Sequence, residues 1–151
     1  MKLCLIVSNF YPKISKLLIE GAVSKLKKNK IFKFQIISVP GTFEIPVVLS
    51  NLIDKYDAFV VLGCVIKGQT SHFDLITQST NNGLMNLSII NKKPIGNGII
   101  ACSNKKQALD RSSTKKIAKN KGFESARAIY ELLKIFYWWK IMILLKIQEL
   151  L

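Results

Sequence analysis

Residues 57–74 read DAFVVLGCVIKGQTSHFD, and this stretch decides the fold. Its uninterrupted apolar run Phe59–Leu62 is typical of a strand that is buried on both faces. We therefore predict a strand over Asp57–Gly63, a loop over Gly63–His72 and a helix over Phe73–Ile90. A buried strand that leads into a helix indicates a parallel sheet.

The segments on either side continue the same alternation. Strands are predicted over Leu3–Ser8, Phe34–Val39 and Ile95–Cys102, and helices over Ile14–Leu26, Glu44–Ile53, a short stretch from an N-cap at Asn104 to Asp110, and a last helix from near Phe123. With 151 residues and no linker or repeat, the chain is expected to form one α/β domain whose parallel sheet is covered on both faces. Ligands in such folds bind at the carboxyl ends of the strands, so the loops there are predicted to carry the chemistry.

The composition excludes several classes of protein. Hydrophobic residues make up 49% and charged residues 21%, which is typical of a globular chain. Cys4, Cys64 and Cys102 lie in apolar runs and form no CxxC pair, so they are interpreted as buried free thiols rather than as a disulfide framework. The first residues lack the features of a secretory signal, and a cytoplasmic location is expected.

The charge is strongly basic. Lys and Arg total 23 against 9 acidic residues, a formal net charge of +14. Only Arg111 and Arg127 are arginines, although nucleic-acid surfaces usually draw on arginine for phosphate and base contacts. The charge is therefore interpreted mainly as solvated lysine-rich faces that would also steer a phosphorylated substrate. A basic polyanion-binding protein is the alternative.

The loop before the predicted helix at Phe73 holds the densest set of functional residue types. Gly68 permits close backbone approach, and the amides of Gln69 and Thr70 would point outward at a helix N-terminus, which is an anion site. His72 is the only histidine of the chain. The positive end of the helix favours its neutral imidazole, which can take and return protons. An ordinary capping histidine is an equally good interpretation at this stage.

Three further residues are candidates for binding. Phe10 follows a strand directly and is a stacking surface for a planar heterocycle or else a core aromatic. Glu44 either accepts hydrogen bonds from a polyol or interacts with the dipole of its own helix. Arg111 is suited to bidentate recognition of an oxyanion, although Arg127 is an arginine without such a context.

Four blocks of sequence make the chain resemble the lumazine synthase (6,7-dimethyl-8-ribityllumazine synthase) family of riboflavin biosynthesis. They fall within Asn9–Ala22, Val39–Pro46, Gly63–Asp74 and Arg111–Gly122. The resemblance implies a flavodoxin-like three-layer α/β/α sandwich that assembles into homopentamers with active sites between subunits. It also implies a transferase, without cofactor or metal, that condenses 5-amino-6-(D-ribitylamino)uracil with 3,4-dihydroxy-2-butanone 4-phosphate.

The resemblance further implies a role for each site residue. His72 is the catalytic proton shuttle. The substrate-binding residues are Phe10, Thr42, Glu44, Val65, Ile66, Asn97 and Lys121, and the phosphate-binding residues are Gly68, Gln69, Thr70 and Arg111. Arg111 and Lys121 are expected to come from the adjacent subunit.

The chain also departs from the family pattern. Asn97 stands where the family usually has Phe, which removes an aromatic wall supplied by the neighbouring subunit. Lys67 replaces an Arg, the segment that includes Lys116–Lys119 is slightly longer than usual, and the family's N-terminal segment ahead of the first strand is missing, which is expected to weaken the pentamer. A catalytically weak homologue that is retained as an assembly is therefore the alternative to an active synthase.

The C-terminal residues lie beyond the family pattern. We divide the chain into a domain over residues 1–135 and an atypical apolar tail over residues 136–151. As a helix this tail would be apolar on every face, unlike a surface helix. We interpret it as an aggregation or assembly element. Contact with a neighbouring subunit, contact with a membrane surface and poorly selected sequence are all open alternatives.

Overall fold

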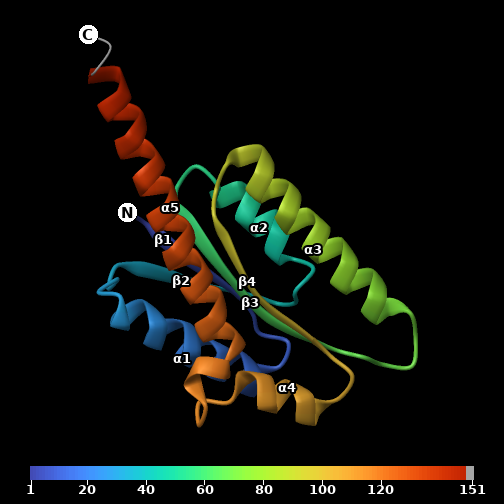
Figure 1. Ribbon diagram of the computed structural model, residues 1–151. Coiled ribbons are helices and arrows are strands. Elements are labelled where there is room, and N and C mark those ends of the chain that lie inside the picture. The colour runs from blue at the N-terminus through green and yellow to red at the C-terminus, as the bar shows by residue number, and fades with distance from the viewer. Residues whose placement is uncertain (149–151) are drawn as a thin grey trace.

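The chain folds into a four-stranded sheet flanked by helices (Figure 1). The computed structural model describes residues 1–148, with side chains placed up to Trp139 and at Met142. In chain order the elements are β1 (Leu3–Ser8), α1 (Pro12–Lys28), β2 (Phe34–Val39), α2 (Ile45–Leu52), β3 (Ala58–Ile66), α3 (His72–Asn91), β4 (Ile95–Cys102), α4 (Lys105–Ser112), a short 3-10 helix η1 (Ile117–Lys119) and α5 (Lys121–Gln148).

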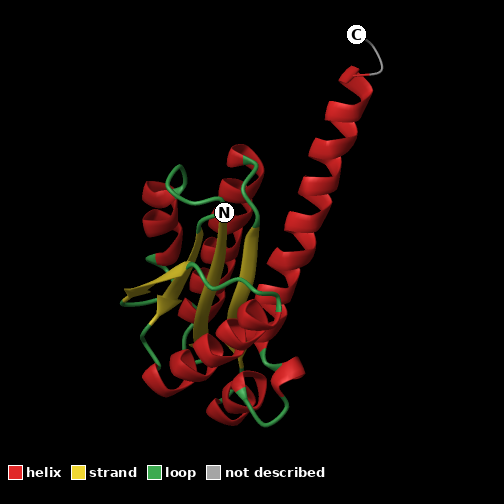
Figure 2. Cartoon of the chain, turned by 90° about the vertical axis from the view of Figure 1, so that its left-hand side faces the viewer, coloured by secondary structure: helices red, strands yellow, loops and turns green. Residues whose placement is uncertain are grey.

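All neighbouring strands of the sheet are parallel, in the order β2-β1-β3-β4. Helices α1, α4 and α5 pack on one face, and α2 and α3 pack on the other. Figure 2 shows the strands between these two helical layers. The predicted α/β sandwich with a parallel sheet is therefore confirmed, and the strand order is that of a flavodoxin-like sheet.

The core is divided by the sheet because strand residues alternate between its faces. Leu3, Leu5 and Val7 of β1 pack toward α1, whereas Cys4 and Ile6 pack toward α2. All six residues of β1 are buried, since this strand has a neighbour on each side and helices above and below. The two inner strands, β1 and β3, are thus held on every side.

Glycines allow α5 to approach the sheet closely. A Cβ added at Gly96 would lie 2.5 Å from the Ser125 carbonyl oxygen, and one at Gly98 would lie 2.8 Å from Ser125 Oγ. A Cβ at Gly122 would overlap the Leu18 carbonyl oxygen of α1. The two glycines of β4 therefore serve helix packing.

The main error of the sequence prediction concerns β3. This strand continues to Ile66, so Cys64, Val65 and Ile66 belong to a strand and not to the predicted loop. The extension is held by pairing with β4, in which Cys64 lies opposite Ile100 and Ile66 lies opposite Cys102. Pairing with a neighbouring strand is a non-local effect that local sequence signals do not report.

The ends of the helices agree more closely with the predictions. Asn104 is the N-cap of α4, and its Oδ1 accepts a hydrogen bond from the Gln107 amide at 2.9 Å. Helix α5 begins at Lys121, two residues before the predicted start, and runs without a break through the proposed boundary at residue 135. Residues 149–151 of the proposed tail lie outside the described residues.

Across residues 1–148, no helix combines the length and the apolar character that crossing a membrane requires.

Candidate functional site

A hollow of about 670 Å³ lies at the carboxyl ends of β1, β2 and β3. It is lined by Phe10, Tyr11, Pro40, Gly41, Thr42, Phe43, Glu44, Cys64, Val65, Ile66, Gly68, Thr70, His72, Phe73 and Ile76. The helices that follow β1 and β3 pack on opposite faces of the sheet. The connections to these helices therefore diverge from the strand ends and leave a crevice between them. Ligand binding was predicted at this edge of the sheet, and most of the predicted site residues are found there.

The end of β1 presents an aromatic ring to the hollow. Phe10 is 67% exposed, so it is not a core aromatic. Its ring forms an edge-to-face pair with the ring of Tyr11, with centroids 5.0 Å apart and planes inclined by 70°. The backbone beneath is fixed by Ser15, whose Oγ donates to the Ser8 carbonyl oxygen at 2.5 Å. This arrangement leaves a face of Phe10 available for stacking.

The loop after β2 packs directly against β3. Thr42 is 5% exposed, and a Cβ added at Gly63 would lie 2.6 Å from Thr42 Cγ2. Glu44 precedes α2 but its side chain makes no capping hydrogen bond. A Cβ at Gly41 would lie 2.7 Å from Glu44 Oε2, so the carboxylate lies against its own loop. Glu44 is half-buried and lines the hollow, which suits it to accept hydrogen bonds from a ligand.

The segment after β3 brings an anion-binding arrangement to the other side of the hollow. Helix α3 begins at His72, and its N-cap Ser71 makes no side-chain capping bond. The His72 amide donates to Thr70 Oγ1 at 3.4 Å. The first amides of a helix have no intrahelical acceptor, and the helix dipole is positive at this end. The polar side of the hollow is thus suited to a negatively charged group.

Gly68 leaves open space beside this helix start. A Cβ at this position would meet no atom within 4 Å. Packing within the chain therefore does not require a glycine, and the space is free for a ligand. Gln69 is exposed next to it and does not line the hollow.

Cys64 forms part of the apolar wall. Burial, and to a lesser extent the neighbouring Cys102 thiol, raises the pKa of Cys64 to about 12. Burial also raises the pKa of Cys102, an effect that the Arg111 guanidinium partly offsets. Cys64 is consequently protonated near pH 7 and is not a thiolate nucleophile.

Besides Gln69, three predicted site residues lie outside this hollow. Asn97 and Lys121 line a second hollow of about 360 Å³ between β4 and α5, together with Glu124, Ser125, Arg127, Ala128 and Glu131. Arg111 is exposed in the last turn of α4. Within a single chain, these three side chains do not join the residues around His72.

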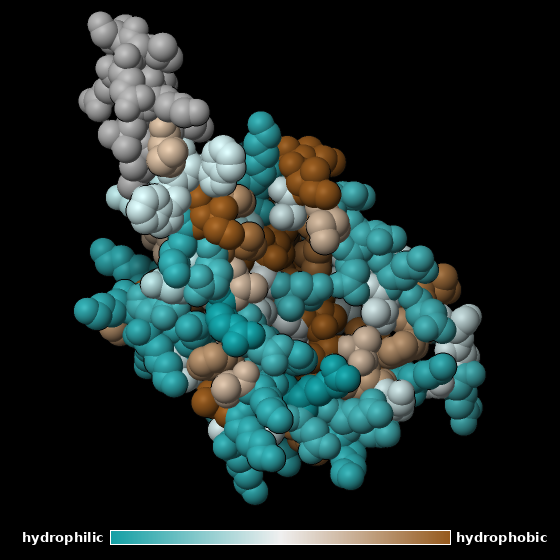
Figure 3. All heavy atoms as spheres, viewed as in Figure 1, coloured by the Kyte–Doolittle hydropathy of each residue, from teal (hydrophilic) through white to brown (hydrophobic). Residues whose placement is uncertain are grey.

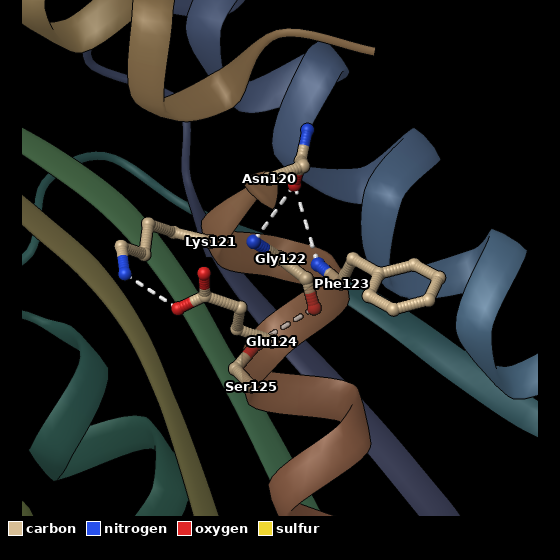
Figure 4. A network of polar contacts seen from close by, with 6 residues as sticks. All are labelled: Asn120, Lys121, Gly122, Phe123, Glu124 and Ser125. Atoms are coloured by element: carbon tan, nitrogen blue, oxygen red, sulfur yellow. Dashed lines mark hydrogen bonds and ion pairs between the residues drawn. The ribbon is translucent and has the colours of Figure 1, made fainter. Parts of the chain in front are cut away.

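Asn97 and Lys121 each have a partner within the chain. Asn97 Nδ2 donates to Asn81 Oδ1 of α3 at 2.6 Å, and Asn97 Oδ1 accepts from the Ile99 amide at 3.0 Å. Lys121 Nζ lies 2.5 Å from Glu124 Oε2, one turn along α5 (Figure 4). Both groups are therefore oriented before any ligand is present.

The start of α5 is fixed by a buried asparagine. Asn120 is 0% exposed, and its Nδ2 donates to the carbonyl oxygens of Leu17 at 3.0 Å and Ser112 at 2.5 Å. Its Oδ1 accepts from the amides of Gly122 at 2.8 Å and Phe123 at 3.2 Å (Figure 4). This one side chain links α1, α4 and α5, and it fixes the helix start that carries Lys121.

The sequence was compared with known proteins. The family model described as 6,7-dimethyl-8-ribityllumazine synthase matches residues 1–136. The chain belongs to this family.

Curated relatives agree with this assignment. A 6,7-dimethyl-8-ribityllumazine synthase of Cutibacterium acnes is 34% identical over 128 residues, which cover 85% of this chain and 77% of that protein. A protein of the same name from Nitrobacter hamburgensis is 36% identical over 138 residues, covering 87% and 83% of the two chains. One from Limosilactobacillus reuteri is 37% identical over 133 residues, covering 87% and 86%.

The hollow of this lumazine synthase family member contains residues that sequence reasoning did not assign to the site. They are Tyr11, Pro40, Gly41, Phe43, Cys64, Phe73 and Ile76. Phe73 and Ile76 follow His72 by one and four residues, and helical spacing places positions four apart on the same face. Tyr11 and Phe43 lie in strand-end loops whose location was predicted, but no motif separated them from other loop aromatics.

Proposed function

We propose that the chain is a 6,7-dimethyl-8-ribityllumazine synthase that condenses 5-amino-6-(D-ribitylamino)uracil with 3,4-dihydroxy-2-butanone 4-phosphate. The observation that carries this proposal is the composition of the larger hollow. One side offers an exposed aromatic ring and an apolar wall, and the other offers a helix N-terminus with the only histidine of the chain. These two sides match a planar heterocycle and a phosphate ester.

The proposed binding mode assigns each side to one substrate. Phe10 stacks on the pyrimidine ring, while Val65 and Ile66 line the apolar wall. Thr42 and Glu44 hold the ring and the ribityl chain. On the opposite side, the phosphate is bound by Gly68, Gln69 and Thr70 at the start of α3, where the space beside Gly68 is open.

The proposed chemistry needs proton transfer and alignment rather than a strong nucleophile. The amine of the first substrate attacks the ketone carbonyl of the second, water and inorganic phosphate leave, and ring closure releases a second water. His72 takes and returns the protons of these steps. Holding two substrates side by side lowers the entropic barrier to their reaction. The protonated Cys64 contributes an apolar surface only.

We propose further that the complete site lies between two copies of the chain within a homopentamer. Arg111, Asn97 and Lys121 do not line the hollow of their own chain. The smaller hollow between β4 and α5 would therefore face the larger hollow of the adjacent subunit. Arg111 then binds the phosphate as a bidentate donor, and Lys121 enters with its orientation set by Glu124.

A direct turnover assay tests this proposal. Purified protein is mixed with both substrates, and the lumazine chromophore is followed by absorbance. His72→Ala is expected to reduce kcat about a hundredfold or more, as for loss of a general acid–base group. Arg111→Ala is expected to raise KM for the phosphorylated substrate, and Arg111→Lys should restore activity only in part because the planar fork is lost.

Controls separate these effects from misfolding. Lys105→Ala removes another exposed cation from α4 and should leave turnover unchanged. Light scattering reports whether each variant keeps the size of the parent. Absence of product from a folded pentamer would refute the enzymatic proposal, and an active monomer would refute the site between subunits.

A catalytically weak homologue is the second candidate, and Asn97 favours it. The amide of Asn97 is bound to Asn81 and offers no aromatic surface to a neighbouring subunit. If this substitution limits activity, Asn97→Phe is expected to raise turnover above that of the parent chain. An unchanged or lower rate would count against this candidate.

A further inference from the structure

The end of α5 extends beyond the rest of the molecule (Figures 1 and 2). Tyr137, Trp138 and Trp139 are 67%, 64% and 67% exposed there. Exposed apolar neighbours are Ile135, Phe136 and Met142. In Figure 3 the visible face of the body is largely hydrophilic, apart from an apolar strip near its centre. The described turns therefore present large aromatic side chains to solvent.

The charges of this segment are evenly distributed around the helix. Lys134, Lys140 and Lys146 are spaced six residues apart, and residues 134–148 contain no Asp or Glu. At 3.6 residues per turn, successive lysines point about 120° apart. Lys134 pairs with Glu131 of the preceding turn at 3.0 Å. Each apolar face between two lysines, such as the one with Ile135, Trp138 and Met142, is therefore flanked by lysine on both sides.

This pattern disfavours a tightly packed protein partner. Packing of any of these faces would bring the flanking lysines to the edge of the contact, where they need acidic partners to offset their partial desolvation. A second copy of the same segment brings further lysines and no carboxylate between residues 134 and 148. Packing of these segments against one another would thus place like charges together.

A bilayer surface accommodates the same pattern. Lysine side chains reach from an apolar environment to the headgroups from any direction around a helix. Trp and Tyr are enriched where the acyl chains meet the headgroups, because their rings are apolar with one polar edge. The chain as a whole carries a formal charge of +14, which complements an anionic surface.

We propose that the end of α5, from Lys134 to Gln148, is an interfacial anchor that binds the surface of a bilayer containing anionic lipids. The aromatic cluster Tyr137–Trp139 lies at the headgroup level, and the lysines contact lipid phosphates. The lysines interrupt the apolar run, so the helix rests in the interface instead of spanning it.

Tryptophan fluorescence tests this proposal without a label, because Trp138 and Trp139 are the only tryptophans of the chain. The full chain is titrated with vesicles of phosphatidylglycerol and phosphatidylcholine, and with phosphatidylcholine vesicles alone. A blue shift of the emission and co-flotation are expected with the anionic vesicles. Replacing Trp138 with Ser keeps Trp139 as the reporter and is expected to weaken partitioning.

A matched pair of charge variants locates the contact. Replacement of Lys134, Lys140 and Lys146 by Gln is expected to weaken partitioning onto anionic vesicles about a hundredfold. The control replaces Lys27, Lys33 and Lys55, which are exposed on the body, by Gln. The two triple variants then have the same net charge. This control is expected to retain most of the binding.

Three results would overturn the proposal. They are an equal loss in both triple variants, an unshifted emission with anionic vesicles, and a blue shift without vesicles that grows with protein concentration. The last result would instead indicate packing against a second copy. Vesicle binding is measured without substrates, so its outcome is independent of the proposed synthase activity.

Discussion

Replacement of the buried Asn120 by Ala is expected to be among the most destabilising single substitutions in this chain. The side chain is fully buried and makes four hydrogen bonds, two to carbonyl oxygens and two from amides. The methyl group of Ala satisfies none of these four backbone groups. With a net loss of about 1 kcal/mol for each, the free energy of unfolding should fall by about 4 kcal/mol.

Two variants make the measurement specific. Asn104→Ala removes an exposed N-cap whose side chain accepts one hydrogen bond, from the Gln107 amide. It should lower the free energy of unfolding by about 1 kcal/mol. Asn120→Asp keeps both acceptor contacts to the amides of α5 but turns a carboxylate oxygen toward the carbonyls of Leu17 and Ser112. It should therefore also destabilise, although its volume is unchanged.

Urea unfolding followed by far-ultraviolet circular dichroism gives the free energies, at one fixed protein concentration because assembly adds to stability. At about 3 °C per kcal/mol for a chain of this size, the melting temperature of Asn120→Ala should drop by about 12 °C. A loss no larger than that of Asn104→Ala would refute the reasoning that Asn120 joins three helices.

Two further predictions concern the larger hollow. Gly68→Ala should leave the melting temperature within about 1 °C of the parent, because its methyl group meets no atom within 4 Å, yet it should raise KM for the phosphorylated substrate. Gly63→Ala should lower the melting temperature because its methyl group clashes with Thr42. Equal melting temperatures for the two variants would contradict this packing argument. Burial raises the pKa of Cys64 from about 9 to about 12, so the native thiol should react slowly with iodoacetamide at pH 8 and rapidly in urea, and fast native labelling would contradict its burial. Because the unfolded thiol loses its proton first, Cys64 should contribute stability that is fully present below pH 9 and is lost as the pH rises toward 12.

The sequence was sufficient to predict the order and type of the elements because the strands are strongly apolar and the helices periodic. Leu3–Ser8, Phe34–Val39 and Ile95–Cys102 were predicted with their observed bounds. Asn104 was identified as an N-cap because capping is a local interaction between neighbouring residues. The hollow at the strand ends followed from the topology of a parallel sheet.

The remaining features depend on contacts between distant segments. The extension of β3 to Ile66 is set by its pairing with β4. The absent side chain of Gly96 admits the Ser125 backbone of α5. The role of Asn120 depends on Leu17, which is 103 residues away in the sequence. No local pattern reports such partners, so neither packing nor the network at α5 was predicted.

Helix α5 connects the smaller hollow to the proposed anchor, and its length keeps their electrostatic effects apart. Lys121 and Trp138 are seventeen residues apart in the sequence, which corresponds to roughly 26 Å along a straight helix. This distance is about three Debye lengths at physiological ionic strength, so charges at the tip are screened from Lys121. Replacement of Lys140 and Lys146 by Gln should thus leave turnover in solution unchanged while vesicle binding falls. A parallel loss of turnover would mean that the end of α5 also contributes to subunit assembly, because screening rules out a direct effect of its charge on the site.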